Sequence, residues 1–378
     1  MKKLKTLVYV DPQSGGSLAM YDYSLLKGME NNQITFCCST LYDAPIDTKV
    51  RYIPIFTYNR KKHILKFISY ITSLIRLVAI LRKSRPDTLH IQWWRVWLLD
   101  YLFLILYKKF VGQVVFTAHN LMPHNSKPSM KKKCIKYYNK IDKIIVHEKN
   151  AKIELVNSFG IKEDKIFIIP HGTLKLKVDN EHVNQLVAYI KNKYNLENKI
   201  VIGSMGTQGP YKGSDLIRDA YKQSEKLINN KNIVLLIAGR GNIFNESIDV
   251  SEYQNLIVNN KFMTEDEFEA YMQIVDVLLL PYRKISQSGV LLTAIEKEIP
   301  FAVTPIGGLI EPFSIAQVGW TIKDASIESV QLFMEYVSEN ISEIIKIKND
   351  TDSWCRIKKY YDWTNISAKT ENVYDFVN

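Results

Sequence analysis

The chain has 378 residues, of which 46% are hydrophobic and 24% are charged. This length suggests two domains or one large one, and the composition excludes a short peptide, a collagenous chain and a mainly disordered protein. The net charge of +11 would suit a nucleic-acid binder, a protein at a membrane surface or a protein with anionic substrates.

The first half of the chain alternates short β-branched, apolar runs with helical stretches. Such alternation is typical of a parallel sheet covered by helices. The first run is too short for a signal peptide, and no export is expected from it. The expected strands are Thr6–Val10, Ile34–Cys38, Tyr52–Ile55, Thr88–Gln92, Gln113–Ala118, Lys143–His147 and Lys165–Ile169.

The pattern breaks at Ile169–Thr173, where Pro170 and Gly172 end the last run. The charge balance changes sign near the same place: residues 1–180 carry 30 Lys and Arg against 13 Asp and Glu, whereas residues 181–378 carry 20 against 26. A polar helical stretch, Val178–Glu197, then leads into a second series of strands. These are Lys199–Ser204, Ile233–Ala238, Asn255–Val258, Asp276–Leu280, Pro300–Thr304 and Val318–Ile322.

The two series predict an α/β protein with two consecutive doubly wound (Rossmann-like) domains. The expected ranges are 1–172 for the first domain and 173–355 for the second, with a C-terminal helix at 356–378 that crosses back to the first domain. The basic first domain is expected to face a polyanionic surface. The four cysteines show no metal-binding spacing, which favours reduced thiols in a cytoplasmic protein.

In a doubly wound sheet the ligand lies at the carboxyl ends of the strands, so the loops after strands are candidate sites. Gly15 and Gly16 follow the first strand and precede a helix, where backbone N–H groups can approach an anion. A plain turn explains them equally well. His119 follows the strand Gln113–Ala118 and therefore belongs at the same edge, as a functional residue or as a hydrogen-bonded structural one.

The loop Gly203–Asp215 of the second domain contains Gly206, Thr207 and Lys212. A glycine-rich turn with one lysine fits a diphosphate, because its amides can approach closely and the ammonium is a compact cation. It matches neither the GxGxxG motif nor the P-loop, so dinucleotide binding and ATP γ-phosphate chemistry are not expected. The alternative is a plain strand-to-helix turn.

A second anion site is expected after the strand Asp276–Leu280. Ser288 is a good N-cap for a helix through Leu291–Lys297, which would offer a hydroxyl and amides to a phosphate. The loop Pro305–Glu311 would close the same crevice. The expected donor residues here are Ser286, Gln287, Ser288, Gly289 and Val290.

The chain contains no Ser/His/Asp set and no HExxH motif. Hydrolase chemistry is therefore not expected, and neither is a metal site or a cofactor.

Residues 61–83 show the spacing of a basic amphipathic helix, with an apolar stripe formed by Ile64, Ile68, Ile71, Ile75 and Val78. Together with the tryptophans at 93, 94 and 97 and the lysines at 131–133, it suits an anionic cytoplasmic leaflet. Alternatively, the stripe packs on the sheet and the lysines are solvated. The longest apolar region, Trp93–Tyr107, is interrupted by charges and is not expected to span a membrane. Nucleic-acid motifs are absent.

Taken together, six segments in order resemble the family-4 type of retaining glycosyltransferases with the two-domain GT-B fold, over essentially the whole chain. The matching segments are Ser14–Gly16, Thr117–Asn120, Val146–Glu148 with Phe159–Ile161 and Ile169–Gly172, Pro210–Gly213, and Leu280–Tyr282 through Gly308.

The resemblance implies two domains that face each other across a cleft, the second holding a nucleotide diphosphate sugar and the first holding the acceptor. It implies that Lys212 carries the diphosphate, that Gly15 and Gly16 cap it, and that His119 faces the donor hexose. Phe262 matches the position whose backbone touches the base. Retention of anomeric configuration is implied in the same way.

Two departures from the family pattern stand out. The arginine usual near the start of the phosphate loop is missing from residues 203–211, so Arg240 or Arg283 would have to supply a cation. Of the two usual glutamates, the second falls at or near Thr293. Glu296, one helical turn further, could make the ribose contact instead.

The expected activity is metal-independent transfer of a hexose from a UDP- or GDP-linked sugar to a saccharide acceptor, lipid-linked and used for surface polysaccharide. The protein would then lie at the inner face of the plasma membrane. A catalytically silent GT-B protein that binds a nucleotide sugar or a partner transferase is the alternative, and a nucleotide-sugar epimerase is a third possibility.

Overall fold

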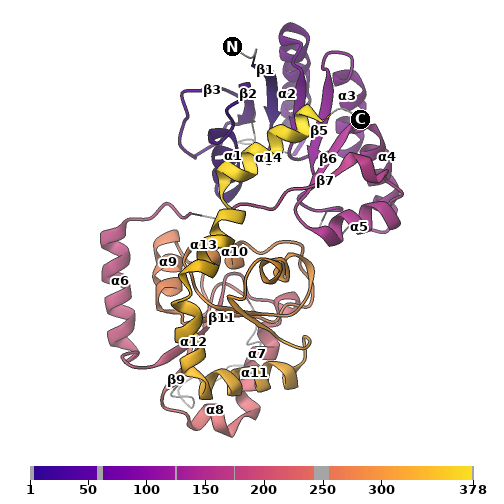
Figure 1. Cartoon of the computed structure of the whole chain (residues 1–378). Coiled ribbons are helices and arrows are strands. Elements are labelled where there is room, and N and C mark those ends of the chain that lie inside the picture. Colours follow the sequence, from indigo (N-terminus) through magenta and orange to yellow (C-terminus); the bar gives the residue numbers. More distant parts are fainter. Residues whose placement is uncertain (1–3, 58–62, 124–125, 174, 242–254, 377–378) are drawn as a thin grey trace. The chain divides into compact units, whose positions relative to one another are not determined.

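The computed structural model describes residues 4–57, 63–123, 126–173, 175–241 and 255–376. The chain forms two compact units (Figure 1). The first consists of Met1–Gly172 together with Tyr361–Asn378, and the second of Thr173–Tyr360. Lys61 and Lys62, at the start of the predicted basic helix, lie outside the described residues.

The first unit contains a seven-stranded parallel sheet in the order β3-β2-β1-β4-β5-β6-β7. Its strands are β1 Lys5–Val10, β2 Asn32–Ser39, β3 Val50–Phe56, β4 Thr88–Ile91, β5 Gln113–Thr117, β6 Lys143–Val146 and β7 Ile166–Ile168. Its helices are α1 Ser17–Lys27, α2 His63–Ser84, α3 Trp97–Tyr107, α4 Ser129–Lys140, α5 Lys149–Asn157 and α14 Trp363–Asp375.

The second unit contains a six-stranded parallel sheet in the order β10-β9-β8-β11-β12-β13. Its strands are β8 Ile200–Met205, β9 Ile233–Ala238, β10 Leu256–Asn259, β11 Val277–Leu280, β12 Phe301–Val303 and β13 Gly319–Thr321. Its helices are α6 Asn180–Lys193, α7 Ser214–Gln223, α8 Glu225–Asn229, α9 Glu265–Ile274, α10 Gly289–Glu296, α11 Ile327–Glu339, α12 Ile341–Lys348 and α13 Thr351–Tyr360. The prediction of two doubly wound parallel sheets is confirmed.

Each sheet of the pair buries both faces, which is why its strands are almost continuously apolar. In the first unit, one face packs against side chains of α2, α3, α4 and α5, while the other packs against α1 and α14. In each sheet the first three strands are added toward one edge and the following strands toward the other edge. The strand order therefore reverses once, between β1 and β4 in the first sheet and between β8 and β11 in the second. These two reversal points are where a doubly wound fold places its ligands.

The C-terminal segment forms two helices rather than the single predicted helix at 356–378. The break lies at Asp362, whose carboxylate accepts a hydrogen bond from Thr364 N (2.9 Å) and so begins a new helix, α14. Gly172 packs so closely on the Trp363 ring that a Cβ added there would lie 2.3 Å from it. The preceding helix, α13, belongs to the second unit.

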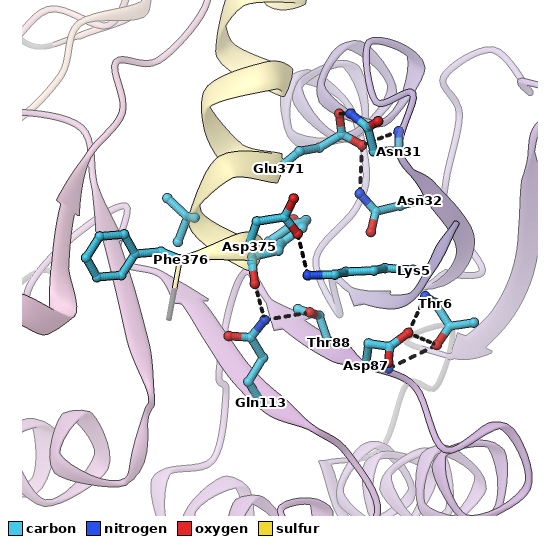
Figure 2. Close-up of polar contacts among 12 residues, drawn as sticks. Lys5, Thr6, Asn31, Asn32, Asp87, Thr88, Gln113, Glu371, Asp375 and Phe376 are labelled. Atoms are coloured by element: carbon cyan, nitrogen blue, oxygen red, sulfur yellow. Dashed lines mark hydrogen bonds and ion pairs between the residues drawn. The ribbon is translucent and has the colours of Figure 1, made fainter. Parts of the chain in front are cut away.

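Polar contacts fix α14 to the first unit (Figure 2). The Glu371 carboxylate accepts hydrogen bonds from Asn31 N (2.7 Å), Asn31 Nδ2 (3.0 Å) and Asn32 Nδ2 (2.7 Å). Near the end of the helix, Asp375 pairs with Lys5 (2.5 Å), and Gln113 Nε2 donates to the backbone carbonyl of Tyr374 (2.7 Å). The last helix is therefore an integral part of the first unit.

The face of helix α2 that packs on the sheet differs from the predicted apolar stripe. Its core side chains are Tyr70, Leu74, Leu77 and Leu81, while Ile64, Ile68 and Ile75 are 66%, 51% and 55% exposed. Of the other two residues of the stripe, Val78 packs against the core and Ile71 is half-buried, so the interpretation in which the whole stripe packs on the sheet is wrong. Residues 64–84 of α2 are long and apolar enough to cross a membrane, with a mean hydropathy of 1.9 in an 18-residue window, a property the sequence analysis missed.

Candidate functional site

A cavity of about 460 Å³ opens at the reversal point of the second sheet. The loops after β8 and β11 supply most of its wall, including Gly206, Thr207, Lys212 and the residues from Gln287 to Val290. The loop after β9 adds Arg240, and Phe262 and Thr293 complete the sequence-predicted residues found there. The structure thus brings together residues that lie up to 87 positions apart in the chain.

The loop after β8 is held in shape by its neighbours. Gln208 Nε2 donates to Gly206 O (2.8 Å) and Ala238 O (3.2 Å), and Gln208 Oε1 accepts from Ser214 Oγ (2.6 Å). Gly239 packs against the same loop: it has a φ of +137°, and a Cβ there would lie 1.9 Å from Gly206 O. The loops after β8 and β9 therefore fit together only because position 239 has no side chain.

Lys212 places an ammonium group in this cavity with no anionic partner among the described residues. Burial lowers the pKa of Lys212 to about 8. Its Nζ lies 5.4 Å from the centre of the Tyr282 ring, and a Cβ on Gly206 would lie 3.2 Å from it. A partly desolvated cation without a carboxylate is costly unless a ligand supplies the opposite charge. The arrangement therefore favours an anion.

The first turn of α10 faces the same cavity. Ser288 caps the helix as predicted, since its Oγ accepts a hydrogen bond from Leu291 N (3.3 Å). The N–H groups of Gly289 and Val290 precede any possible acceptor within the helix, and the positive end of the helix dipole adds to their attraction for an anion. Ser286 does not line the cavity; its carbonyl accepts from Gly308 N (2.9 Å), which ties the two loops together.

The two arginines suggested as the missing cation differ in availability. Arg283 makes a two-pronged ion pair with Asp215, at 2.7 Å for both contacts, and this pair holds the pKa of Asp215 below its ordinary value. Arg240 lines the cavity and is exposed. Arg240 is therefore the better placed of the two.

Thr293 and Glu296 line different cavities, although they are only three positions apart in the sequence. Thr293 lines the cavity, with its Oγ1 bonded to Gly289 O (3.0 Å). Glu296 lines a different cavity, of about 750 Å³, and its carboxylate pairs with Lys175 (3.3 Å). Glu296 therefore does not join Thr293 in the way the sequence analysis expected. Phe262 is 79% exposed at the rim, where its ring is open to a stacking partner.

The Gly15-Gly16 loop lies at the reversal point of the first sheet. Gly16 adopts a φ of +58°, and its N–H donates to Asp43 Oδ1 (2.9 Å). The amide predicted to contact a diphosphate is thus bonded to a carboxylate of the same chain. A phosphate oxygen at Gly16 would have to displace Asp43.

His119 belongs to a hydrogen-bonded row along the carboxyl edge of the first sheet. The row runs through residues that follow β4, β5, β6 and β7 in turn. Gln92 Oε1 lies 2.8 Å from His119 Nε2, His119 Nδ1 lies 3.1 Å from His147 Nε2, and His147 Nδ1 lies 2.9 Å from Ile169 O. Trp93 stacks on the His119 ring, with centroids 4.7 Å apart.

The row also extends toward the core through His90, whose nitrogens lie 2.7 Å from Tyr374 OH and from Thr117 Oγ1. Burial lowers the pKa of His90 and of His147 to about 3, and burial together with His147 holds the pKa of His119 well below its ordinary value. These rings are neutral at pH 7. Both nitrogens of His119 are already bonded within the first unit, and its ring packs against Trp93 and Tyr21, so its side chain fixes the edge of the sheet.

Several of these residues were not singled out from the sequence. Gln208 and Gly239 organise the phosphate loop, and Gln92 and His147 hold His119. A signal was available for three of them, because Gly239, Gln92 and His147 each come directly after or at the end of a predicted strand. Among the described residues, no group of three or more His, Cys, Asp or Glu side chains could hold a metal ion.

Comparison with known families matches both units separately. The family described as Glycosyltransferase Family 4 matches residues 20–173, and the family described as Glycosyl transferases group 1 matches residues 187–348. Comparison with curated protein sequences found no match.

Solved structures of three proteins are similar over nearly the whole chain. A glycosyltransferase from Rickettsia africae has a TM-score of 0.70 at 14% identity, covering 98% of each chain. HepE from Anabaena in complex with UDP and glucose has a TM-score of 0.69 at 11% identity, covering 97% of this chain and 98% of its own. Sucrose-phosphate synthase from Thermosynechococcus elongatus has a TM-score of 0.70 at 14% identity, covering 98% of each chain.

Proposed function

The chain is a glycosyltransferase with the GT-B fold, and from that premise we propose that it transfers a hexose from a UDP- or GDP-linked sugar to a saccharide acceptor, with retention of anomeric configuration. The observation that carries the proposal is the partly buried ammonium of Lys212 in the cavity of the second unit, without an acidic partner among the described residues. A nucleotide diphosphate is the ligand that would supply the opposite charge.

The donor chemistry follows from the charge that develops in the reaction. As the bond between the hexose and the diphosphate breaks, negative charge grows on the leaving phosphate, and groups fixed in advance around it lower the barrier. Lys212 and the first-turn amides of α10 supply such groups. Charge neutralisation by this chain's own groups makes a divalent metal unnecessary in the proposed mechanism. HepE, which holds UDP and glucose, is consistent with this ligand class.

Phe262 and Thr293 are the proposed nucleoside contacts. The exposed ring of Phe262 offers a stacking surface, and Thr293 takes the place where the family pattern has a glutamate. A threonine hydroxyl makes one neutral hydrogen bond in place of a charge-assisted pair, so we expect a weaker ribose contact than in relatives with the glutamate.

The acceptor is proposed to be lipid-linked and to serve surface polysaccharide synthesis at the inner face of the plasma membrane. Support comes from the excess of cations in residues 1–180 and from α4, which has five lysines and no acidic residue. Lysines near an anionic surface contribute about 1 kcal/mol each to binding. The first unit would then hold the acceptor.

Purified protein incubated with UDP- and GDP-hexoses and a lipid-linked saccharide extract tests the proposal. We expect nucleotide release that depends on the acceptor, persists in EDTA and gives a product with the donor's anomeric configuration. Binding of nucleotide without acceptor-dependent release would favour the catalytically silent alternative. Conversion of the donor without any acceptor would favour an epimerase.

A further inference from the structure

Large apolar side chains gather on the outer surface of two helices of the first unit. Eight of the twenty large apolar side chains that are exposed in the described parts of the chain lie on α2 and α3. The six that form two lines, which we call the apolar ridge, are Ile64, Ile68 and Ile75 of α2 and Leu98, Leu102 and Ile105 of α3. Their exposed fractions range from 41% to 66%. A concentration of this kind marks an interaction surface.

The three ridge residues of each helix lie on one side of it. Leu98, Leu102 and Ile105 are spaced by four and three positions, which places them on a single line along α3. Ile64, Ile68 and Ile75 are spaced by four and seven positions, with the same result along α2. Each line points away from the core, because the same helices bury other residues, such as Leu74 and Leu104.

The two lines also lie near each other. Ser69 and Ser73 of α2 donate to the carbonyls of Thr57 and Ile55, at 3.2 and 2.6 Å, so that flank of α2 faces the end of β3. Because β3 is the edge strand, the opposite flank of α2 faces α3, which packs beside it (Figure 1). The ridge residues of α2 lie between the flank that faces α3 and the side of the helix that faces solvent.

The charges on these helices are of one sign. Helix α2 carries Lys66, Arg76, Arg82 and Lys83 and has no acidic residue. The one acidic residue of α3, Asp100, is 8% exposed and accepts a hydrogen bond from Tyr70 OH (2.6 Å) inside the unit. On the far side of α3, α4 adds its five lysines. The surface formed by these helices therefore has apolar side chains along the ridge and cationic side chains around it.

We propose that the apolar ridge inserts into the acyl layer of an anionic bilayer, with α2 and α3 lying in the plane of the membrane. This extends the membrane location proposed above from electrostatic contact to insertion. A second copy of the chain is disfavoured as the occupant, since it would bring like charges together. A spanning α2 is also disfavoured, because Tyr70, Leu74, Leu77 and Leu81 would have to leave the core.

Flotation with vesicles of phosphatidylglycerol and phosphatidylethanolamine tests the proposal without any sugar substrate, so its outcome is independent of transfer activity. The ridge variant is Ile68→Ser with Ile75→Ser and Leu102→Ser, and the matched control is Leu332→Ser with Ile345→Ser, at positions 60% and 53% exposed on the second unit. We expect the parent and the control to float, in part even at 0.5 M salt, and the ridge variant to bind at least about tenfold more weakly.

Equal flotation of the ridge variant and the parent would overturn the proposal, as would complete loss of parent binding at 0.5 M salt, because purely electrostatic attachment is screened. Sedimentation of the parent gives a further check. A dimer that the ridge variant dissociates, with unchanged vesicle binding, would assign the ridge to a second copy instead. Circular dichroism of each variant establishes that it is folded before these comparisons.

Discussion

The two sheets share one strand order over six strands, to which the first sheet adds β7, but they carry different chemistry at their carboxyl edges. In the second unit the edge presents to a cavity the glycine amides and Lys212, which pairs with no acidic side chain in the described parts of the chain, an arrangement suited to an anion. In the first unit the corresponding edge is a row of neutral side chains, Gln92, His119 and His147, that bond mainly to one another. The strand order therefore determines where in each unit a ligand lies, whereas the residues of the loops determine which kind of ligand binds there.

The comparison also changes the meaning of the net charge. The cation-rich part of the chain, residues 1–180, keeps lysines on the outer helices α2 and α4 and a neutral row at its ligand edge. The part with excess acidic residues holds the cation that faces the cavity. The net charge of each part therefore describes its outer surface, whereas the partly buried Lys212, which has no acidic partner among the described residues, indicates the ligand.

The largest expected effect comes from Lys212→Ala. Removal of a preplaced charge that acts on the leaving group should lower kcat by about 100- to 1,000-fold. Lys284→Ala, at an exposed lysine in the next loop, is the matched control and should leave kcat unchanged. Steady-state assays of nucleotide release measure both. If kcat of the Lys212 variant stayed within threefold of the parent, the anion edge would not include this lysine.

Gly239→Ala tests the packing of the loops that shape the anion edge. A methyl group at this φ of +137° would meet Gly206 O at 1.9 Å, and we expect a loss of about 2 kcal/mol in the free energy of unfolding. Gly209→Ala, in extended backbone with ordinary contacts at 3.6 Å, should cost much less. Urea denaturation compares the two variants. Equal losses would show that the contact at Gly239 relaxes easily.

The neutral edge should make the protein sensitive to acid. Burial lowers the pKa of His90 to about 3, so below pH 6.5 the unfolded chain binds a proton that the folded chain does not, and stability falls as pH falls. Between pH 7.5 and 5 this one residue should contribute a loss of about 2 kcal/mol. His90→Gln should remove that contribution. Burial raises the pKa of Asp11 and of Asp100 to about 6, so the folded chain takes up protons there as pH falls through that value. This gain in stability offsets part of the loss, but equally in both proteins.

Urea denaturation of parent and His90→Gln at both pH values isolates the histidine, because each protein serves as its own reference. The loss between pH 7.5 and 5 should be smaller in the variant. An identical pH dependence in the two proteins would mean that His90 titrates normally in the folded state.

The smallest expected effect is at the arginines. Arg240→Ala should raise KM for the donor by about tenfold, as expected for the loss of one exposed charge contact worth about 1.4 kcal/mol. Arg283→Ala should change KM less, because Arg283 is paired with Asp215. Donor titrations with both variants measure the difference. A larger KM effect at Arg283 would reverse the assignment of the second cation.

Local sequence patterns predicted much of this architecture. The thirteen strands found in the described parts of the chain were all expected within about two residues of their observed bounds, because continuous apolar, β-branched runs have few alternatives to a buried parallel strand. The Ser288 cap followed from side-chain chemistry alone. The face that α2 buries did not, because apolar side chains lie both on the face that packs in the core and on the exposed face.

Long-range pairing accounts for the other differences. Glu296 was expected beside Thr293, but Lys175, which is remote in sequence, draws its carboxylate to another cavity. Gly16 looked like a free amide, but Asp43 bonds to it from 27 positions away. Such contacts depend on how separate segments meet in the fold, which no local pattern encodes.

The most direct test of the account is binding of nucleotides to the parent and to Lys212→Ala, followed by thermal unfolding. UDP or GDP at about 100 times its Kd should stabilise the parent by about 2.7 kcal/mol, through the relation RT ln(1 + [L]/Kd). The account predicts a clear rise in Tm with one of these diphosphates, a smaller rise with the matching monophosphate, and loss of most of the rise in Lys212→Ala. No rise with either diphosphate, or an equal rise in the variant, would contradict the claim that the buried lysine holds a nucleotide diphosphate.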